Sequence, residues 1–365
     1  MYGSFVLAAG LPHGYNYIMS RIKFTFFILC LAFIMPQAVS ANRIIYGNDD
    51  RLDYSEASKA QQGLADSVVS IWSKAKIKTF AGDNAHYYLE TEPLSESPFK
   101  VCSEEKFSNQ LSGAFCSGSL VGTDLVLTAG HCTLKYECRD TAVVFGFNEN
   151  LVKQNASKAV VRDGHTYLPV PRENVYYCSS YPAKFPEDYD IAVMKLNSSV
   201  SGRRALVVDG NHLVQVGESV FTIGHPLGST LKVAGNAGVR FVSYEEPEIF
   251  FAADLDTFAG NSGSPVFNTV SKKIIGVLTE GGNDFVPSEK GCSSYNVLAA
   301  DARGGEIIRF VKPALKYLPA DKAATGTANT ANRTSTGVRA VSIPSVPVQR
   351  NNFKKPVPAI NFDGF

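Results

Sequence analysis

Residues 260–268 read GNSGSPVFN, and this stretch carries most of the information about architecture and chemistry. Ser262 stands between glycines and precedes an apolar run that is typical of a β-strand. A nucleophilic serine needs backbone N–H groups that converge on the oxygen of the attacked carbonyl, and an upstream glycine lets the chain bend to supply them. Gly260 and Ser262 would donate these amides. The alternative is a glycine and serine turn without chemistry.

A serine that hydrolyses a bond needs a general base with a pKa near neutrality, and the chain has six histidines. His131 is the best candidate, because LTAGHC, residues 127–132, ends a strand-like run beside Cys132. A disulfide from Cys116 to Cys132 would close a loop of about 17 residues and stabilise the fold by ~3 kcal/mol. A histidine beside a disulfide can also be purely structural. His225, in Gly-His-Pro, is expected in a turn.

The imidazole of a general base needs a carboxylate that fixes its tautomer and stabilises the imidazolium. Asp190 opens DIAVMKL, residues 190–196, a strand-like run that should be buried. A buried carboxylate is costly unless it is hydrogen-bonded, so Asp190 should have a partner. The alternative for Asp190 is a turn aspartate, whereas Asp188 is more typical of a solvated loop.

The blocks LTAGHC, DIAVMKL and GNSGSP, in this order, resemble the His, Asp and Ser motifs of the trypsin-like serine peptidases. The order excludes the subtilisin-like and α/β-hydrolase arrangements. FCSGSL, residues 115–120, is similar to the strand that supplies the partner of Cys132. The resemblance covers about residues 44–318 and implies two packed six-stranded antiparallel β-barrels (chymotrypsin-like) with the catalytic groups in the cleft between them. GNSGSP is also similar to the bacterial glutamyl-endopeptidase-like (V8-like) branch.

Residues 44–295 consist mostly of short apolar or alternating runs separated by Gly, Asn, Asp and Pro, which is an all-β pattern. Strands are expected within residues 119–129, 141–147, 190–196, 219–225, 238–244, 248–255 and 272–279. Residues 306–318 carry apolar residues at helical spacing, so a C-terminal helix is expected there, bent or ended by Pro313.

Six of the seven cysteines lie after residue 40, and an even number in an exported chain predicts three disulfides and an oxidising compartment. Besides Cys116–Cys132, we favour Cys138–Cys178 and Cys102–Cys292, although four cysteines allow three pairings. The cysteines are too dispersed for a zinc site, and we expect no metal and no cofactor.

Residues 1–40 have the pattern of a secretory signal peptide: basic residues, an apolar run over 24–35 and small residues before the cleavage point. As a helix this run would rise about 18 Å, well short of a ~30 Å hydrocarbon core, so no stable membrane span is expected. Met19 offers a second start, which would leave residues 1–18 untranslated.

Residues 41–43 are expected to be a short propeptide, cut between Arg43 and Ile44. In the animal-type members of the family, the residue before the nucleophile is an aspartate that pairs with the new amino terminus. Asn261 stands there in this chain and has no charge, so cleavage is expected to be trimming and not an electrostatic switch.

The formal net charge is +1, and it becomes −1 without residues 1–40, which hold two basic and no acidic residues. Such a near-neutral chain predicts no nucleic-acid partner. Residues 319–365 are expected to be a flexible low-complexity tail, either a solvated linker or a weak contact for an anionic surface. We expect a monomer, secreted or periplasmic, that acts on protein or peptide substrates.

The resemblance also implies a specificity pocket. Asp256, six residues before Ser262, corresponds to the pocket floor that selects Arg or Lys, and Glu280 adds a negative charge nearby. Gly281 should contact the substrate backbone, and Thr279 should hydrogen-bond the catalytic carboxylate.

Two departures weaken this pocket model. Phe258 stands where trypsin-like enzymes carry a cysteine, so the disulfide of the pocket is missing. Leu278 stands where the glutamate-selecting branch uses a histidine, which argues against an acidic preference. The alternative for Asp256 is a structural aspartate.

The sequence therefore predicts a secreted serine endopeptidase that works through an acyl-enzyme, with Ser262 as nucleophile, His131 as base and Asp190 as its orienting acid. The main alternative is a non-catalytic binding module on the same fold. A structural β-protein would instead leave the three residues scattered.

Overall fold

The computed structural model describes residues 45–244, 249–302 and 304–320. The expected signal peptide, propeptide and tail therefore lie outside the described residues, apart from the first residues after Leu318. Within the described ranges, no helix combines the length and the apolar character that a membrane crossing requires.

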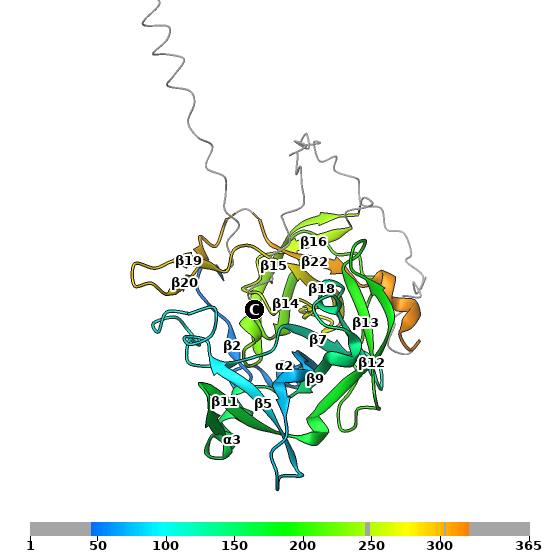
Figure 1. Ribbon diagram of the computed structural model, residues 1–365. Helices are drawn as coiled ribbons and strands as arrows, with labels where there is room; N and C mark the ends of the chain where they lie inside the picture. The colour runs from blue at the N-terminus through cyan, green and yellow to red at the C-terminus, as the bar shows by residue number, and fades with distance from the viewer. Residues whose placement is uncertain (1–44, 245–248, 303, 321–365) are drawn as a thin grey trace, which may run out of the picture. The chain divides into compact units, whose positions relative to one another are not determined.

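Six antiparallel strands close into a first barrel, in the order β12-β13-β8-β7-β3-β9 (Figure 1). They are β3 (Val68–Ser73), β7 (Cys116–Leu120), β8 (Leu125–Ala129), β9 (Thr141–Phe145), β12 (Val175–Phe185) and β13 (Ile191–Leu196). Pairing between β9 and β12 closes the barrel and leaves no free edge.

A second barrel follows the order β14-β17-β18-β22-β16-β15 and is closed by pairing between β14 and β15. Its strands are β14 (Ser219–Gly224), β15 (Lys232–Ser243), β16 (Phe250–Ala253), β17 (Pro265–Asn268), β18 (Ile274–Glu280) and β22 (Glu306–Phe310). The short strand β2 (Leu52–Asp53) pairs with β15 outside this circuit. The two six-stranded barrels confirm the expected chymotrypsin-like fold.

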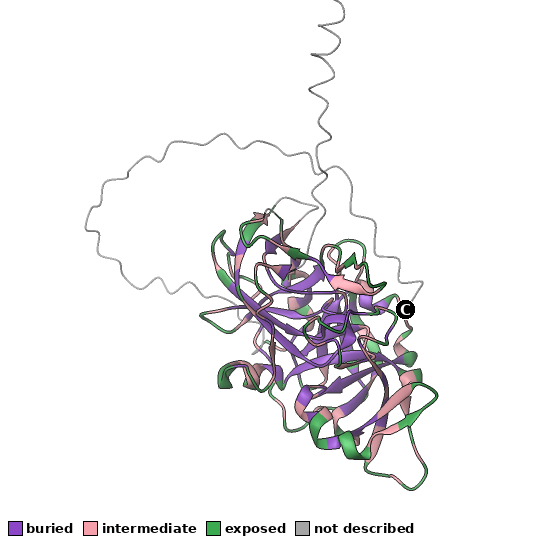
Figure 2. Cartoon of the chain, turned by 90° about the vertical axis from the view of Figure 1, so that its left-hand side faces the viewer, coloured by how far each residue is buried: buried purple, intermediate pink, exposed green. Residues whose placement is uncertain are grey.

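Apolar side chains of both barrels form one continuous core, which explains why the barrels pack together. The cluster includes Phe145 and Val193 of the first barrel and Phe221 and Phe267 of the second. The last two rings stack with centroids 4.9 Å apart. Burial of such residues follows the strands of the barrels, and exposed residues gather in the connecting segments (Figure 2). A burial of this kind is the main stabilising contribution in a β-barrel.

Several smaller elements cover the barrels. A sheet of β10-β11-β5-β4, with β6 paired to β5, packs over the buried Trp72 and Phe147. Its strands are β4 (Ile77–Lys78), β5 (His86–Pro93), β6 (Leu111–Ser112), β10 (Val160–Arg162) and β11 (His165–Pro171). The helices are α2 (Lys59–Ala65), which begins with a capping box at Ser58, and α3 (Glu149–Asn155).

Two further strand pairs lie beside the second barrel. β1 (Ile45–Tyr46) pairs in parallel with β21 (Val297–Leu298), and β19 (Phe285–Pro287) pairs with β20 (Ser293–Tyr295). They bring the start of the described chain onto the loops that precede β22.

The predicted strand segments are confirmed, but the C-terminal helix is only partly right. Residues 306–310 form β22, which fills the gap between β16 and β18, and a 3₁₀-helix follows at Lys312–Tyr317. The apolar spacing of this segment fits a helix, but its burial also follows the two-residue repeat of a strand, since Glu306 and Ile308 are buried. Pairing with two strands decides in favour of the strand, and Pro313 stands near the start of the 3₁₀-helix.

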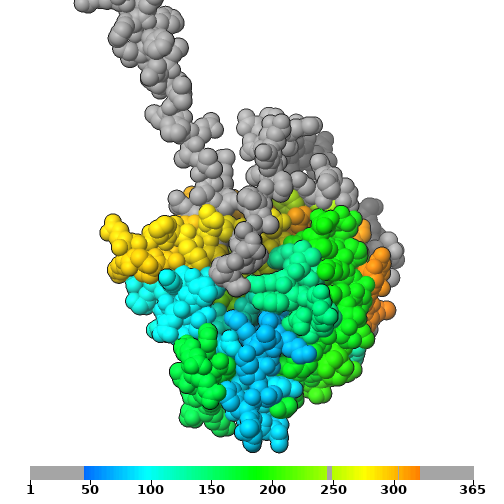
Figure 3. Space-filling view, in the orientation of Figure 1, coloured from blue at the N-terminus to red at the C-terminus, as the bar shows by residue number. Residues whose placement is uncertain are grey.

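The three favoured disulfides are confirmed as Cys116–Cys132, Cys138–Cys178 and Cys102–Cys292. The last one joins residues 190 positions apart, and next to it Val101 forms a bridge with Ser293. In the space-filling view the two segments, cyan and yellow, lie against each other (Figure 3). This disulfide therefore fastens a long loop of the first half of the chain to the loops of the second barrel.

Candidate active site

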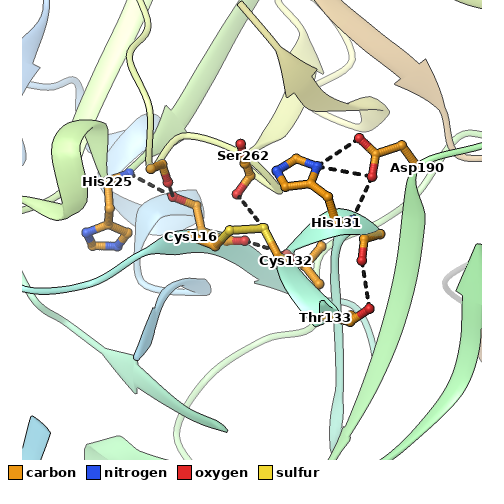
Figure 4. Close-up of a disulfide and its surroundings, with 11 residues drawn as sticks. Cys116, His131, Cys132, Thr133, Asp190, His225 and Ser262 are labelled. Carbon is orange, nitrogen blue, oxygen red and sulfur yellow. Dashed lines mark hydrogen bonds and ion pairs between the residues drawn. A yellow bond between two sulfur atoms is a disulfide. The ribbon is translucent and has the colours of Figure 1, made fainter. Parts of the chain in front are cut away.

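His131 and Asp190 meet at the edge of the first barrel. His131 follows β8 and Asp190 precedes β13, and these two strands are paired, so their adjacent ends bring the two residues together. The ring Nδ1 of His131 lies 2.8 Å from Asp190 Oδ2 and 3.1 Å from Oδ1, and the backbone N–H of His131 donates to Oδ1 at 2.7 Å. The carboxylate thus fixes both the ring and the backbone of the histidine (Figure 4).

The backbone around this pair is specialised. Asp190 has a φ of +46°, in the left-handed region that aspartate tolerates better than most residues. Gly130 leaves room for it, since a Cβ at Gly130 would lie 3.0 Å from Asp190 Oδ1 and 2.6 Å from the Cα of Pro186. The glycine in LTAGHC is therefore required by close packing of the carboxylate.

Ser262 lies on the side of the imidazole that faces away from Asp190 (Figure 4). Its carbonyl accepts a hydrogen bond from the backbone N–H of Ser117 at 2.8 Å, which ties the serine loop of the second barrel to β7 of the first. Among the described residues, no hydrogen bond joins the Ser262 hydroxyl to His131. Catalytic hydrogen bonds are often long in unliganded enzymes and shorten in the substrate complex.

The loop before Ser262 has the bend that converging amides require. Gly260 has a φ of +88°, and a Cβ there would lie 2.6 Å from the backbone nitrogen of Gly228. The Gly260 carbonyl accepts from the Ser117 hydroxyl at 2.8 Å, which orients it away from the amide side of the loop. Only glycine fits this position, as expected for a loop that presents its N–H groups to an oxyanion.

The Cys116–Cys132 disulfide lies directly beneath the site. Cys132 follows His131 in the chain, and its sulfur lies 3.6 Å from the Ser262 carbonyl (Figure 4). The two sulfurs and a ring nitrogen of His131 fall within 4.8 Å of one another. Because both sulfurs are bonded to each other, they offer no thiolate to a metal ion.

Asp256 is buried, but its carboxylate is already hydrogen-bonded to backbone. Oδ1 accepts from the N–H of Tyr46 at 2.8 Å, and Oδ2 accepts from the N–H of Asp50 at 3.4 Å. Burial raises the pKa of Asp256 to about 7, with a further contribution from the acids Asp50 and Asp49. These contacts favour the structural alternative over a pocket floor that waits for a substrate cation.

Thr279 was expected to hydrogen-bond the carboxylate of Asp190, and no such bond is found among the described residues. Its hydroxyl donates to the carbonyl of Ile307 at 3.3 Å. The pairing of β18 with β22 is irregular between Leu278 and Glu280, at the position of Thr279. Glu280 is exposed and pairs with Arg309 at 2.9 Å, so its charge is partly neutralised.

The sequence analysis missed a buried acid between the two segments that were expected to form the pocket. Glu306, at the start of β22, accepts from the Thr257 hydroxyl at 2.6 Å through Oε2, and the backbone of Gly282 also stabilises its carboxylate. A Cβ at Gly281 would lie 2.2 Å from this carboxyl group. Burial raises the pKa of Glu306 well above its ordinary range, and Asp284 and Asp256 add to the rise. No motif marked this residue, because only strand pairing brings it here.

Two other contacts of the site were not foreseen. The Ser117 hydroxyl accepts from the N–H of His225 at 2.9 Å and donates to Gly260, so it links three segments. His225 lies in the expected turn but is also fully buried, with Nδ1 donating to the carbonyl of Ser229 at 2.9 Å. Burial lowers the pKa of His225 to about 3, so it is a neutral structural histidine.

Part of the chain is similar to known serine proteases. Residues 116–277 match the family model of the trypsin-like peptidase domain. This span contains His131, Asp190 and Ser262.

A curated relative is snake venom serine protease 5 of Trimeresurus stejnegeri, 22% identical over 187 residues. The match covers 49% of this chain and 62% of the length of the relative. Similar solved structures include the active form of the Rv3671c protease of M. tuberculosis, with 14% identity, a TM-score of 0.40 and coverage of 73% of this chain and 86% of that one. The MamO protease domain of Magnetospirillum magneticum, in its apo form, has 14% identity, a TM-score of 0.36 and coverage of 71% and 99%.

Proposed function

We propose that the peptidase domain is a serine endopeptidase that hydrolyses peptide bonds in proteins or peptides. The observation that carries the proposal is the bond from His131 Nδ1 to the Asp190 carboxylate, with Ser262 on the opposite side of the same ring. This arrangement leaves Nε2 free to accept a proton from the serine.

In the proposed first step, the Ser262 hydroxyl attacks the substrate carbonyl and its proton moves to His131 Nε2. The Gly260 and Ser262 amides stabilise the oxyanion, and Asp190 stabilises the imidazolium. The C–N bond then breaks, the proton passes from Nε2 to the leaving amine, and an acyl-enzyme remains. In the second step, a water molecule gives its proton to Nε2 and attacks the ester, and the proton returns to the Ser262 oxygen as the C–O bond breaks.

The disulfides support a chain that matures in an oxidising compartment outside the cytoplasm. The choice between secretion and the periplasm, the monomeric state and membership of the V8-like branch stay predictions.

The preference for Arg or Lys before the scissile bond also stays a prediction, and its basis changes. Asp256 is hydrogen-bonded by backbone N–H groups, whereas Glu306 is a second buried acid whose carboxyl group lies beside Gly281. Peptides that differ only in Arg, Glu or Phe before the cut test the preference. Equal turnover of all three would remove it, and loss of an Arg preference in Glu306→Gln but not in Asp256→Asn would assign it to Glu306.

The proposed activity is tested with a fluorophosphonate probe, which phosphorylates an activated serine. Mass spectrometry of the labelled wild type should place the adduct on Ser262, and Ser262→Ala should stay unlabelled. Folded wild-type protein that is not labelled, or that is labelled elsewhere, would contradict the proposal and favour a non-catalytic binding module.

A further inference from the structure

Arg51 is almost completely buried, at 1% exposure, although it carries a permanent charge. Its guanidinium lies 4.4 Å from the ring centroid of Phe258, 4.9 Å from that of Tyr295 and 5.2 Å from that of Phe107. The same group forms a two-point bond with Asp49, through Nε at 2.8 Å and Nη2 at 2.5 Å. We call these three rings with Asp49 the Arg51 cage. A desolvated cation among aromatic rings is held more strongly than one at the surface.

The segment that carries Arg51 is held by backbone hydrogen bonds before it, and after it β2 pairs with β15 of the second barrel. The N–H of Ile45 donates to the carbonyl of Asn296 at 3.1 Å, and the N–H of Gly47 donates to the carbonyl of Leu298 at 2.8 Å. The bond from Tyr46 to Asp256 adds a third attachment. The position of Arg51 is therefore set by backbone pairing and not by its own side chain.

The cage includes the loop that presents the oxyanion amides. Phe258 is two residues before Gly260, and its carbonyl accepts from the N–H of Asn261 at 3.0 Å. The intervening Ala259 donates its N–H to Asp284 at 3.0 Å. The ring of Phe258 thus fixes one end of a short, hydrogen-bonded bend whose other end is the nucleophile. None of the three disulfides in the described part of the chain includes this end of the loop, where Phe258 stands instead of a cysteine.

We infer that Arg51 is a positioning residue for the oxyanion loop: the Arg51 cage holds Phe258, and through it the Gly260 amide, in place of the missing disulfide. This inference rests on the proposed function. Removing an oxyanion donor lowers kcat by about 10²–10³, and a loop that is loosened without being removed should lose part of this factor. The loss should fall on kcat, because the Gly260 amide contacts the transition state more strongly than the bound substrate.

The test compares Arg51→Met, which keeps an apolar side chain of similar length, with Arg172→Met. Arg172 lies 4.3 Å from the ring of Tyr87 on the sheet that covers the first barrel, so the control loses the same kind of contact away from the loop. Both variants are measured below their unfolding transitions. We expect kcat to fall about 10-fold or more in Arg51→Met, with KM within about twofold, and to be unchanged in Arg172→Met.

A second readout does not depend on activity. Amide hydrogen exchange over residues 256–264 is measured in Ser262→Ala with and without Arg51→Met, and it should become faster in the double variant. If the wild type neither hydrolyses peptides nor reacts with the probe, the proposed function is wrong while the loop is still tested by exchange. Unchanged exchange, or a folded Arg51→Met with wild-type kcat, would overturn the inference. If Arg51→Met does not fold, Phe258→Leu removes the ring and keeps apolar volume, and the same outcomes apply.

Discussion

Two regions of the candidate site differ in how the sequence brings their residues together: the proposed proton-transfer pair, and the buried acids near the expected specificity pocket. His131 and Asp190 stand at adjacent ends of paired strands, so the local backbone already brings them together. Asp256 and Glu306 are surrounded by segments far away in the sequence, such as Tyr46, 210 positions from Asp256. The first region is encoded by short motifs, and the second by tertiary contacts that no motif reports.

Replacing Asp190 with Asn should have the largest effect, because the amide no longer fixes the tautomer of His131. We expect kcat to fall by about 10⁴ in steady-state hydrolysis of a peptide substrate. Asp188→Asn, an exposed position two residues earlier, is the control and should keep full activity. Equal activity of Asp190→Asn and wild type would show that Asp190 is not the acid that orients His131.

Replacing Gly260 with Ala tests the boundary between the two regions. The new Cβ would lie 2.6 Å from the nitrogen of Gly228, and φ is +88°, so the loop must move. We expect kcat to fall by about 10²–10³. Gly217→Ala has the same kind of strain, with φ of +85° and open space around the new Cβ, and should lower thermal stability without lowering kcat. A similar kcat in both variants would show that the Gly260 amide does not stabilise the oxyanion.

Two disulfides of the first barrel can be compared, because only Cys116–Cys132 lies next to His131, the proposed general base. Replacing Cys116 and Cys132 together with Ser should lower the free energy of unfolding by ~3 kcal/mol and also lower kcat, since the segment after His131 is released. Replacing Cys138 and Cys178 together opens a longer loop and should lower the free energy of unfolding by ~4 kcal/mol with little change in kcat. Denaturant titration measures the loss of stability and steady-state kinetics measures kcat. A larger loss of kcat without Cys138–Cys178 than without Cys116–Cys132 would contradict the proposed role of His131.

Glu306 should produce the smallest effect, as a pH dependence of stability. Burial raises its pKa in the folded state above the unfolded value, so the folded state binds the proton more tightly. The resulting stability is fully present below the unfolded pKa and is lost as pH rises through the folded pKa, by about 1.4 kcal/mol for each unit of difference. Glu306→Gln should therefore gain stability relative to wild type as pH rises from the unfolded pKa of Glu306 through its raised folded pKa.

Thermal unfolding across this range, with Glu289→Gln at an exposed position as the control, measures the effect. A difference between Glu306→Gln and wild type that stays constant with pH would mean that the carboxyl group is not perturbed as described.

Alternating runs predicted the strand segments and an even set of cysteines predicted three disulfides, whereas the two barrels were implied by the resemblance of three motifs to the trypsin-like peptidases. The sequence placed His131 next to Asp190 through motifs whose glycine and aspartate are required by the backbone. The sequence did not reveal that residues 306–310 form a strand, because the spacing of their apolar residues also fits a helix. Their pairing with β16 and β18 decides between the two. The hydrogen bond from Thr279 to Ile307 was not foreseen, and the irregular pairing of β18 with β22 at this point cannot be seen in a single sequence.

The most direct test of the account is a crystal structure of the wild-type protein with a fluorophosphonate bound. The account predicts a covalent bond from phosphorus to Ser262 Oγ, the phosphoryl oxygen within about 3 Å of the Gly260 and Ser262 nitrogens, and His131 Nε2 within about 3.2 Å of Ser262 Oγ. An adduct on another residue, or an imidazole that stays turned away from the serine, would contradict it.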